Sequence, residues 1–325
     1  MNVCILLLSV DEAPMLEWSL PAAVTQEPAA EVVVVDNASS DETGALAARH
    51  GACHLRLERR LTYAAAINEA IRRTAGDAVL LLNADCRLRP GFLAAALPRL
   101  AKPGVGSVAP KLLRAARPPL SSSTDQIDTA AMVIDRRRKN GLVGHARPAQ
   151  TYGRPAAVFG ADGAAALYRR EVLASCMLDD GEVLDEDMEL WASDADLAWR
   201  AQLLGWRSVY EPGAVAEHVR TYSPSTRDQM SEAARRLQFR NRYLMMIKNE
   251  TAAGLARDLP WIVGYEVVAL GHVLLRERHL LGGYRDAWRL RDGAWRRRAA
   301  VQARRRRLAT PVRRAIPPFG LRASE

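Results

Sequence analysis

The sequence predicts an α/β fold with a doubly wound, mainly parallel sheet and a helical extension at its C-terminal end. Three observations predict this fold. Apolar runs of strand length at residues 3–8, 31–35 and 78–82 lack polar alternation, as expected for strands covered on both faces. Segments with helical spacing separate these runs. Short loops join the segments, and strands that alternate with helices in this way favour a parallel sheet.

The first third of the chain supplies most of this alternation. After the strand at residues 3–8, the spacing predicts helices at 17–24, 42–50, 63–74 and 90–100. The loop from Asp36 to Asp41 has the Asp, Asn and Ser side chains that cap helix N-termini. In such sheets ligands bind at the carboxyl ends of the strands, so Ser9, Asp36 and Asp85 become candidate site residues.

The second part is less regular. Residues 114–124 are rich in Pro and Ser, residues 127–134 fit a strand, and residues 136–150 are rich in Gly and Arg. This stretch is either a loop-rich insertion that shapes a substrate pocket or a disordered surface loop. Regular spacing then resumes. It predicts strands at 164–168, 206–210 and 215–218, and helices that start at 169 and run over 194–204 and 227–247.

Composition excludes several classes of protein. The chain has 325 residues, of which 49% are hydrophobic and 26% charged, so it is neither disordered nor collagenous. Its four cysteines contain no CxxC pair, which argues against a zinc ribbon or a disulfide framework and fits a reducing compartment. The length allows one large domain or two small ones.

The positive charge is concentrated at one end of the chain. The net charge is +9, whereas residues 285–325 alone carry 13 Arg and 3 acidic residues, a net of +10. The N-terminus lacks the cationic start of a signal peptide. No uninterrupted apolar run reaches about 18 residues, and the best candidate, residues 259–275, is interrupted by Glu266 and His272. We therefore predict neither a signal peptide nor a transmembrane helix.

Polar residues at the strand ends allow two interpretations each. A carboxylate at Asp36, beside Asn37, can accept hydrogen bonds from a nucleobase or a ribose, or it can simply cap a turn. Asn83 and Asp85 lie two positions apart, so on an extended chain both side chains point to one side. They could hold Mg²⁺ or Mn²⁺ by oxygen once a diphosphate adds further ligands, or they could form an ordinary turn.

An acidic stretch precedes the helix predicted at 194–204. Asp194 and Asp196 stand at its start, where an Asp beside an apolar wall can act as a general base. The alternative is helix capping and a favourable interaction with the helix dipole. His218 is either a structural histidine or a third metal ligand beside Asp85.

Five motifs in order resemble the family 2 glycosyltransferases, closest to a bacterial rhamnosyltransferase-like branch. The motifs are VVVVDNASSDET (32–43), LLNADCRLRPGFL (81–93), GADGAAALYRREVL (160–173), SDADLAWRAQLLGWRSVYEPGAVAEH (193–218) and RNRYL (240–244). The resemblance covers roughly residues 1–250. It implies a GT-A fold, a nucleotide-diphosphate sugar donor, Mg²⁺ or Mn²⁺, and inversion of the anomeric centre in one displacement.

The resemblance also implies roles for individual residues. Asp194 corresponds to the family's catalytic base, with Asp196 and Asp162 in supporting positions. Asp85 corresponds to a metal ligand, and His218 to a histidine that completes the metal site in some relatives. The residues implied in nucleotide binding are Ser9, Asp36, Asn37, Tyr63, Asn68 and Asn83.

We therefore expect an inverting glycosyltransferase of cell-surface polysaccharide synthesis. The expected donor is dTDP-rhamnose or a UDP-hexose, and the expected acceptor is a hydroxyl of a glycan or of a lipid-linked molecule. Two alternatives are a sugar nucleotidyltransferase and a non-catalytic, regulatory nucleotide-sugar-binding protein. The first would need a Gly-rich basic loop after the first strand, where residues 10–14 are acidic and lack Gly.

The expected domain organisation has three parts. Residues 1–225 form the catalytic domain, with a nucleotide-binding half (1–113) and an acceptor and catalytic half (114–225). Residues 226–258 form a long helix that packs on it, and residues 259–325 form a helical basic segment.

The basic segment combines apolar helical stretches, tryptophans and Arg clusters, which fits an interfacial helix on anionic lipid. The alternative is a packed hairpin or a homodimer contact. No nucleic-acid recognition motif accompanies the charge. We expect a cytoplasmic protein, peripheral on the inner face of the cell membrane.

Overall fold

The structure is a computed structural model that describes residues 1–118, 123–222 and 226–307. Two of the segments discussed above lie partly outside the described residues. They are the Pro/Ser-rich stretch, at residues 119–122, and the basic C-terminal segment, from residue 308 onward.

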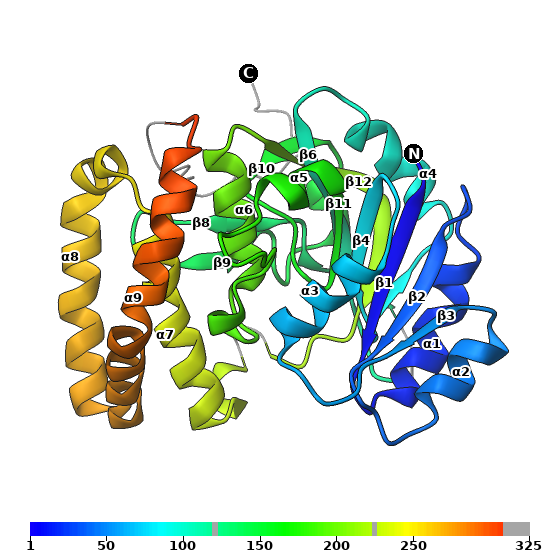
Figure 1. Ribbon diagram of the computed structural model, residues 1–325, viewed down its shortest axis with the longest axis horizontal. Coiled ribbons are helices and arrows are strands. Elements are labelled where there is room, and N and C mark those ends of the chain that lie inside the picture. The colour runs from blue at the N-terminus through cyan, green and yellow to red at the C-terminus, as the bar shows by residue number, and fades with distance from the viewer. Residues whose placement is uncertain (119–122, 223–225, 308–325) are drawn as a thin grey trace.

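A mixed, mainly parallel sheet forms the centre of the protein (Figure 1). Its order is β10-β12-β6-β11-β4-β1-β2-β3, with β5 paired to β12 and β7 paired to β6. Strands β3, β2, β1 and β4 are parallel, β11 runs antiparallel between β4 and β6, and β12 is parallel to β6. The strands are β1 (Val3–Ser9), β2 (Glu31–Asp36), β3 (Cys53–Arg56), β4 (Ala78–Asn83), β5 (Cys86–Leu88), β6 (Val105–Ala115), β7 (Ser123–Thr129), β10 (Ala156–Val158), β11 (Ala165–Arg169) and β12 (Arg207–His218).

Helices cover both faces of the sheet, which explains the continuous apolar runs in the sequence. In β1, Leu6 packs on the face that carries α3, α5 and α6, whereas Ile5 and Leu7 pack on the face that carries α1, α2 and α4. The fold class predicted from the sequence is therefore confirmed. The helices are α1 (Ala13–Val24), α2 (Thr43–Arg49), α3 (Tyr63–Arg73), α4 (Phe92–Leu100), α5 (Arg170–Ser175), α6 (Ser193–Leu203), α7 (Glu232–Asn249), α8 (Ala252–Leu275) and α9 (Leu281–Ala303).

Five strands have no counterpart among those predicted from the sequence: β3, β5, β6, β9 (Asn140–Leu142) and β10. Two of them, β3 and β6, show why. β3 is a short edge strand whose side chains are mostly exposed, so it has no apolar run. β6 is central but contains Pro110, a residue that argues against a central strand because it has no N–H to donate. Pro110 is tolerated because it pairs with Glu211 at an irregularity in the β6–β12 ladder. The same irregularity joins the two strands predicted at 206–210 and 215–218 into the single strand β12.

The irregular region 114–158 contains regular structure. β6 extends to Ala115, β7 follows, and β8 (Met132–Ile134) pairs with β9 (Asn140–Leu142). The single strand predicted at 127–134 is thus divided between β7 and β8. A 3₁₀ turn, η1 (Ala149–Tyr152), leads to β10. β7 carries a residue of the candidate site described below.

Several helices begin or end at other residues than predicted. α1 begins at Ala13 rather than at residue 17, since Pro14 suits the first helical turn. α7 begins at Glu232 after a 3₁₀ turn, η3 (Arg227–Gln229), because the Ser231 hydroxyl caps the helix by accepting from Ala234 N. Two further 3₁₀ turns are η2 (Glu186–Met188) and η4 (Arg278–Leu280).

The three last helices form a layer of their own beside α6 (Figure 1). Trp199 and Leu203 of α6 pack with Met245 of α7 and Val301 of α9 in a separate apolar cluster. The boundary predicted between residues 258 and 259 falls inside α8, and the one predicted between 113 and 114 falls inside β6. The division of the chain into domains stays a prediction.

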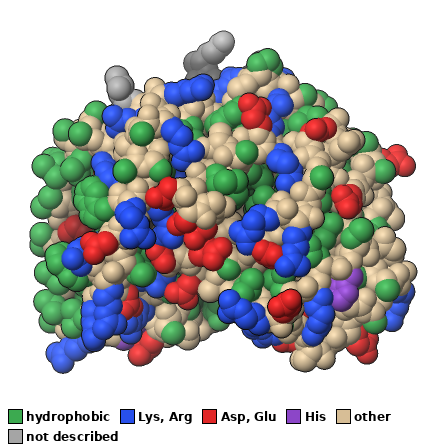
Figure 2. Space-filling view, viewed as in Figure 1, with side chains coloured by type: hydrophobic (Ala, Val, Ile, Leu, Met, Phe, Trp, Pro, Cys, Tyr) green, Lys and Arg blue, Asp and Glu red, His purple; other side chains and the backbone are tan. Residues whose placement is uncertain are grey.

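One helix in the described part of the chain, α8, is long and apolar enough to cross a membrane by length and composition alone. Only 22% of its most apolar window is buried inside the protein. Hydrophobic side chains gather at the left edge of the molecule, over this helix (Figure 2).

Candidate functional site

The predicted site residues of the first half stand at one edge of the sheet. Ser9 at the end of β1 is paired in register with Asp36 at the end of β2, and Leu8 is paired with Asn83 at the end of β4. These strands are parallel, so their carboxyl ends meet at the same edge. Asp85 follows two residues later, between β4 and β5.

Asp36 is fully buried and already has several donors. Its Oδ1 accepts from Ser39 N at 2.7 Å, and its Oδ2 lies 2.9 Å from His54 Nε2 and 2.8 Å from an Arg56 guanidinium nitrogen. Burial raises its pKa, but the hydrogen bonds from Ser39 and His54 outweigh burial and lower the pKa below its ordinary value. Asp36 is therefore a fixed carboxylate. Nearby, the buried Ser9 hydroxyl lies 3.2 Å from that of Thr43.

Two of the amides implied in nucleotide binding make hydrogen bonds within the protein, and their role toward a nucleotide stays a prediction. Asn37 donates to Leu61 O and accepts from Leu61 N, which ties the loop before α3 to the end of β2. Asn68 donates to Leu184 O and accepts from Leu184 N at 2.8 Å each. Asn68 thus contacts the segment before η2 and not the strand ends at the edge of the sheet. Asn83 is partly exposed, and its side-chain amide makes no hydrogen bond to the residues that the structure describes.

Asp85 and His218 lie together, as predicted from the resemblance. β5 pairs with the end of β12, and this pairing brings His218 Nε2 within 3.5 Å of Asp85 Oδ1. The opposite ring nitrogen, Nδ1, lies 2.8 Å from Asp128 Oδ2. Burial lowers the pKa of His218, but the charge of Asp85 and the hydrogen bond to Asp128 raise it overall, to about 10.

This pair fits a divalent cation. Asp85 Oδ1 is buried and has no hydrogen-bond partner among the described residues, so one carboxylate oxygen is left for a further ligand. Without a cation His218 is the imidazolium, and its Nε2 proton faces Asp85. A cation bound at Asp85 would displace that proton; His218 would then donate its Nδ1 proton to Asp128 and present Nε2 as a ligand, the common arrangement in metal sites. No group of three His, Cys, Asp or Glu side chains in the described ranges could hold a metal by itself. Further ligands, such as diphosphate oxygens, are needed.

A chain of polar contacts leads from this pair toward Asp194. Arg220 Nε lies 2.8 and 2.9 Å from the two Asp128 oxygens, and another nitrogen of the same guanidinium lies 2.7 Å from Asp162 Oδ2. Next to Asp162, the Gly163 N–H donates to Asp194 Oδ2 at 3.0 Å. We call Asp85, His218, Asp128, Arg220, Asp162 and Asp194 the site cluster. It joins residues from β7, β12, α6 and three loops.

Asp194 has the environment of a general base. Burial and the nearby charge of Asp162 raise its pKa to about 6, although the Gly163 and Ala195 N–H groups donate to its carboxylate. A Cβ at Gly163 would lie 3.4 Å from Asp194 Oδ2 and 3.5 Å from the Tyr63 hydroxyl. These are ordinary van der Waals distances, so Gly163 lies next to both side chains without a steric need for glycine, and all three residues line a small cavity.

Tyr63 lies beside this carboxylate rather than apart from it. Burial, followed by the charges of Asp194, Asp162 and Asp85, raises the pKa of Tyr63 above its ordinary value. The phenol thus stays protonated and can donate a hydrogen bond near Asp194. Because the charges of Asp85 and Asp194 both act on this one phenol, the two carboxylates belong to one electrostatic environment.

Asp196 does not share this environment. Its Oδ2 lies 2.9 Å from Arg200 Nε and 3.0 Å from Lys248 Nζ, and its Oδ1 accepts from the Asn249 amide at 2.6 Å. Lys248 also binds Asp185, which lies 3.1 Å from an Arg297 guanidinium nitrogen. We call Asp185, Asp196, Arg200, Lys248 and Arg297 the buried ion cluster. It fastens the acidic stretch to α7 and α9.

Sequence reasoning missed Asp128 and Arg220. Arg220 follows His218 by two positions, so an extended chain places both on one side, and that spacing was available as a signal. Asp128 lies 90 positions before His218 in a region interpreted as a loop or a single strand. Its role follows only from the pairing of β7 with β6.

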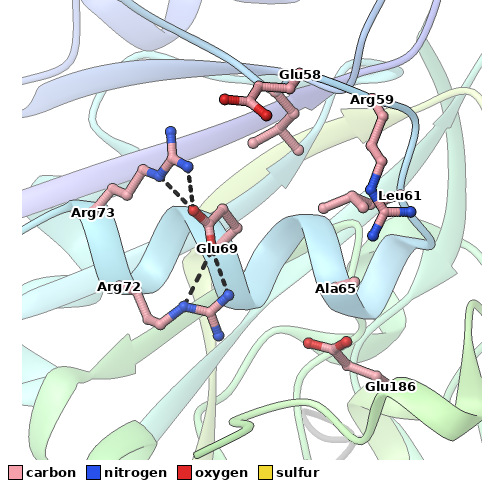
Figure 3. Close-up of a pocket in the computed structure, with 9 residues that line it drawn as sticks. Glu58, Arg59, Leu61, Ala65, Glu69, Arg72, Arg73 and Glu186 are labelled. Atoms are coloured by element: carbon pink, nitrogen blue, oxygen red, sulfur yellow. Dashed lines mark hydrogen bonds and ion pairs between the residues drawn. The ribbon is translucent and has the colours of Figure 1, made fainter.

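A separate cavity lies away from the site cluster. It has a volume of about 320 Å³ and runs along α3. Figure 3 shows that Arg72 and Arg73 both point toward Glu69, while Arg59 approaches from the loop before α3 and Glu186 from the 3₁₀ turn η2. None of the predicted site residues lines it.

Comparisons with known proteins identify the family. The family model described as glycosyl transferase family 2 matches residues 4–176, which is more than half of the chain. This range contains β1, β2 and β4 with the site residues at their ends. A search of curated proteins finds no match.

Three solved structures share the fold. GalNAc-T7, solved with UDP, GalNAc and Mn²⁺, has a TM-score of 0.61 at 14% identity; the match covers 76% of this chain and 48% of that one, so this chain spans about half its length. A Pyrobaculum calidifontis mannosyltransferase, solved with GDP-Man and Mn²⁺, has a TM-score of 0.52 at 20% identity over 93% of this chain and 78% of that one. S. aureus TarS 1–349 has a TM-score of 0.52 at 14% identity over 93% and 83%.

The fold, the arrangement of strand ends and the family match agree with one another. The protein belongs to glycosyltransferase family 2 and has a GT-A fold.

Proposed function

We propose that the protein is a metal-dependent, inverting glycosyltransferase of the rhamnosyltransferase-like branch. The donor would be dTDP-rhamnose or a UDP-hexose, and the acceptor a hydroxyl of a glycan or lipid-linked molecule in cell-surface polysaccharide synthesis. A cytoplasmic location at the inner face of the cell membrane is part of the proposal. The observation that carries it is the continuous contact from Asp85 through Arg220 to Asp194.

The proposed donor site is the edge where β1, β2 and β4 end. Ser9, Asp36 and Asn83 lie there, and two of the solved structures with this fold contain a nucleotide or nucleotide sugar with Mn²⁺. Asp85 and His218, with Asn83 beside them, would hold Mg²⁺ or Mn²⁺. When bound, the cation would offset the negative charge of the donor diphosphate and of the leaving group.

The proposed chemistry is a single displacement. The acceptor oxygen forms a bond to the anomeric carbon while the bond from that carbon to the diphosphate breaks, and the electron pair leaves with the nucleoside diphosphate. Attack from the face opposite the leaving group inverts the anomeric centre. Asp194 accepts the hydroxyl proton, and its raised pKa makes it a stronger base than an exposed Asp. Tyr63, which lines the same small cavity and stays protonated, would donate a hydrogen bond to that carboxylate.

A thermal-shift screen identifies the donor. The purified protein is mixed with a panel of nucleotide sugars in the presence of Mn²⁺, Mg²⁺ or EDTA. A ligand that binds the native state raises the melting temperature, so the correct base and sugar give the largest shift, and EDTA abolishes it. Asp85→Ala should lose the metal-dependent part of the shift. A shift unaffected by EDTA and by Asp85→Ala would refute the metal site.

Release of nucleoside diphosphate separates an enzyme from a binding protein. The wild-type protein should release nucleoside diphosphate slowly with metal alone, by transfer of the sugar to water, and faster with an acceptor, by transfer to the acceptor hydroxyl. A sugar nucleotidyltransferase would instead consume a nucleoside triphosphate and a sugar phosphate. Binding without turnover of any donor would favour the regulatory alternative.

A further inference from the structure

Helix α8 has the opposite polarity of an ordinary surface helix: its acidic side chains face the protein and an apolar side faces outward. Asp258 is fully buried and lies 2.6 Å from Arg136 and 2.9 Å from Arg138. Two turns on, Glu266 lies 2.6 Å from both an Arg242 nitrogen and the Tyr243 hydroxyl. Ion pairs and hydrogen bonds thus account for much of the attachment of α8 to the domain.

The outward side of α8 is apolar along its full length. The structure describes the whole helix, and its exposed side chains are apolar except those of Arg257 and His272. At 1.5 Å per residue, 24 residues give a strip about 36 Å long. Val268 is 70% exposed and Leu275 is 81% exposed. We call this strip the α8 apolar face; its large exposed side chains are Leu255, Leu259, Trp261, Val263, Val267, Val268, Leu270, Leu274 and Leu275.

Such a strip is unusual on a protein that stays in water. Single exposed apolar side chains are normal, but a continuous apolar strip marks a site that another apolar phase or protein covers. The apolar face lies on the outer edge of the molecule, away from the sheet (Figures 1 and 2). It contains none of the site-cluster residues, so what covers it is a separate question from the proposed reaction.

The charges near the strip favour an anionic lipid surface over a second copy of the chain. Arg276 and Arg278 are exposed directly after α8. In α9, Trp288 and Trp295 are exposed and lie seven positions apart, and each is followed directly by an exposed arginine, Arg289 or Arg296. Two such cationic surfaces repel each other in a dimer, whereas anionic headgroups attract them.

We propose that the α8 apolar face docks on an anionic bilayer, with α8 in the plane of the interface and the arginines of α9 at the headgroups. Tryptophan and arginine are the side chains expected at the depth of the headgroups. An in-plane helix keeps the contacts of Asp258 and Glu266 with the domain. A helix that crossed the bilayer would have to give them up.

Vesicle flotation of the full-length protein without donor tests the proposal. We expect binding to vesicles of phosphatidylcholine with phosphatidylglycerol, and at least about tenfold weaker binding to pure phosphatidylcholine. Replacing Val267 and Val268 by Gln removes two exposed apolar side chains from the strip. This double variant should partition about tenfold less into the mixed vesicles.

Two controls keep the test specific. Met177→Gln changes an exposed apolar side chain outside the strip and should bind vesicles like the wild type. Both variants should keep the wild-type melting temperature and donor hydrolysis, because neither alters the site cluster. If the double variant bound vesicles as tightly as the wild type, the α8 apolar face would not be the docking surface.

Two further measurements address the alternatives. In sedimentation equilibrium we expect a monomer; a dimer that the Val267 and Val268 substitutions dissociate would assign the strip to a second copy and overturn the proposal. Alkaline carbonate should release the protein from vesicles, as for an in-plane helix. Retention in the membrane after carbonate would show that α8 crosses the bilayer.

Discussion

The site cluster and the buried ion cluster are both built from carboxylates and cations, and they differ in charge balance. In the buried ion cluster, Lys248 lies between Asp185 and Asp196, and Arg200 and Arg297 add two more cations. Burial raises the pKa of Asp185, but Lys248 and Arg297 lower it overall. Asp194, two residues from Asp196 in sequence, has no cation within ion-pair distance in the described structure, and its pKa rises to about 6.

This difference separates a structural role from a chemical one. Carboxylates that are fully paired stabilise the junction between the domain and the last helices, and they have no free oxygen for a substrate. Asp194 lies next to Asp162 and receives only backbone N–H donors, so it costs folding free energy when ionised and gains basicity. Position in the sequence does not distinguish the two roles, because Asp194 and Asp196 both lie in the first turn of α6.

The largest expected effect concerns the site cluster. Asp194→Asn should reduce glycosyl transfer by about 10²–10⁴-fold, because the acceptor hydroxyl loses its general base. Donor affinity should stay near wild type. The variant should not be less stable at pH 7, since it removes a carboxylate whose folded pKa lies above its unfolded value.

Initial rates and urea unfolding check this prediction. Asp179→Asn, which changes an exposed carboxylate of the same acidic region, serves as the matched control and should leave both unchanged. Normal turnover by Asp194→Asn would show that another group is the base.

The second prediction concerns the buried ion cluster. Lys248→Met should lower the free energy of unfolding by about 3–5 kcal/mol, because it leaves the carboxylates of Asp185 and Asp196 buried near each other with fewer cations. The rate per folded molecule should change little. Urea denaturation followed by circular dichroism measures the loss, with exposed Lys102→Met as the control. An unchanged midpoint would mean that the cluster adds nothing to stability.

The third prediction concerns Asp128, which acts through His218 and Arg220. Asp128→Asn should weaken Mn²⁺-dependent donor binding by about 10–100-fold, the usual range for a residue that orients a metal-binding His. Titration of Mn²⁺ in the thermal-shift assay reports the change independently of turnover. Asp125→Asn, an exposed position of β7, is the matched control. Equal Mn²⁺ dependence in both variants would exclude this positioning role.

The smallest expected effect is the pH dependence of the rate. Asp194 must be ionised to accept a proton, so activity should fall as pH decreases through about 6, to about one tenth of its plateau near pH 5. The charged groups that face Asp194 are Asp162 and, beyond it, Arg220, while Tyr63 stays neutral in this range. Rates measured at saturating donor and acceptor check the profile. A rate independent of pH between 5 and 7 would contradict the assignment.

Part of the site was predictable because its residues stand at fixed places in a parallel sheet. Ser9, Asp36 and Asn83 each end a strand, and the apolar runs locate those ends to within a residue. The polar atoms of Asn37 and Asn68 are taken up by Leu61 and Leu184, which no local pattern reveals. Asp128 could not be found from sequence, because it reaches His218 only through the pairing of β7 with β6.

The pattern of residues was enough to predict the fold class and the edge of the sheet that holds the candidate site. The family resemblance added the prediction that Asp85 lies beside His218. These depend on local periodicity and on residue types at strand ends, which a linear chain displays. The tertiary structure was needed to find that Asp196, which the resemblance had placed in support of Asp194, faces the buried ion cluster, and that α8 presents its apolar side outward. Burial and charge pairing decide both questions, and they depend on which segments, distant in the chain, pack against each residue.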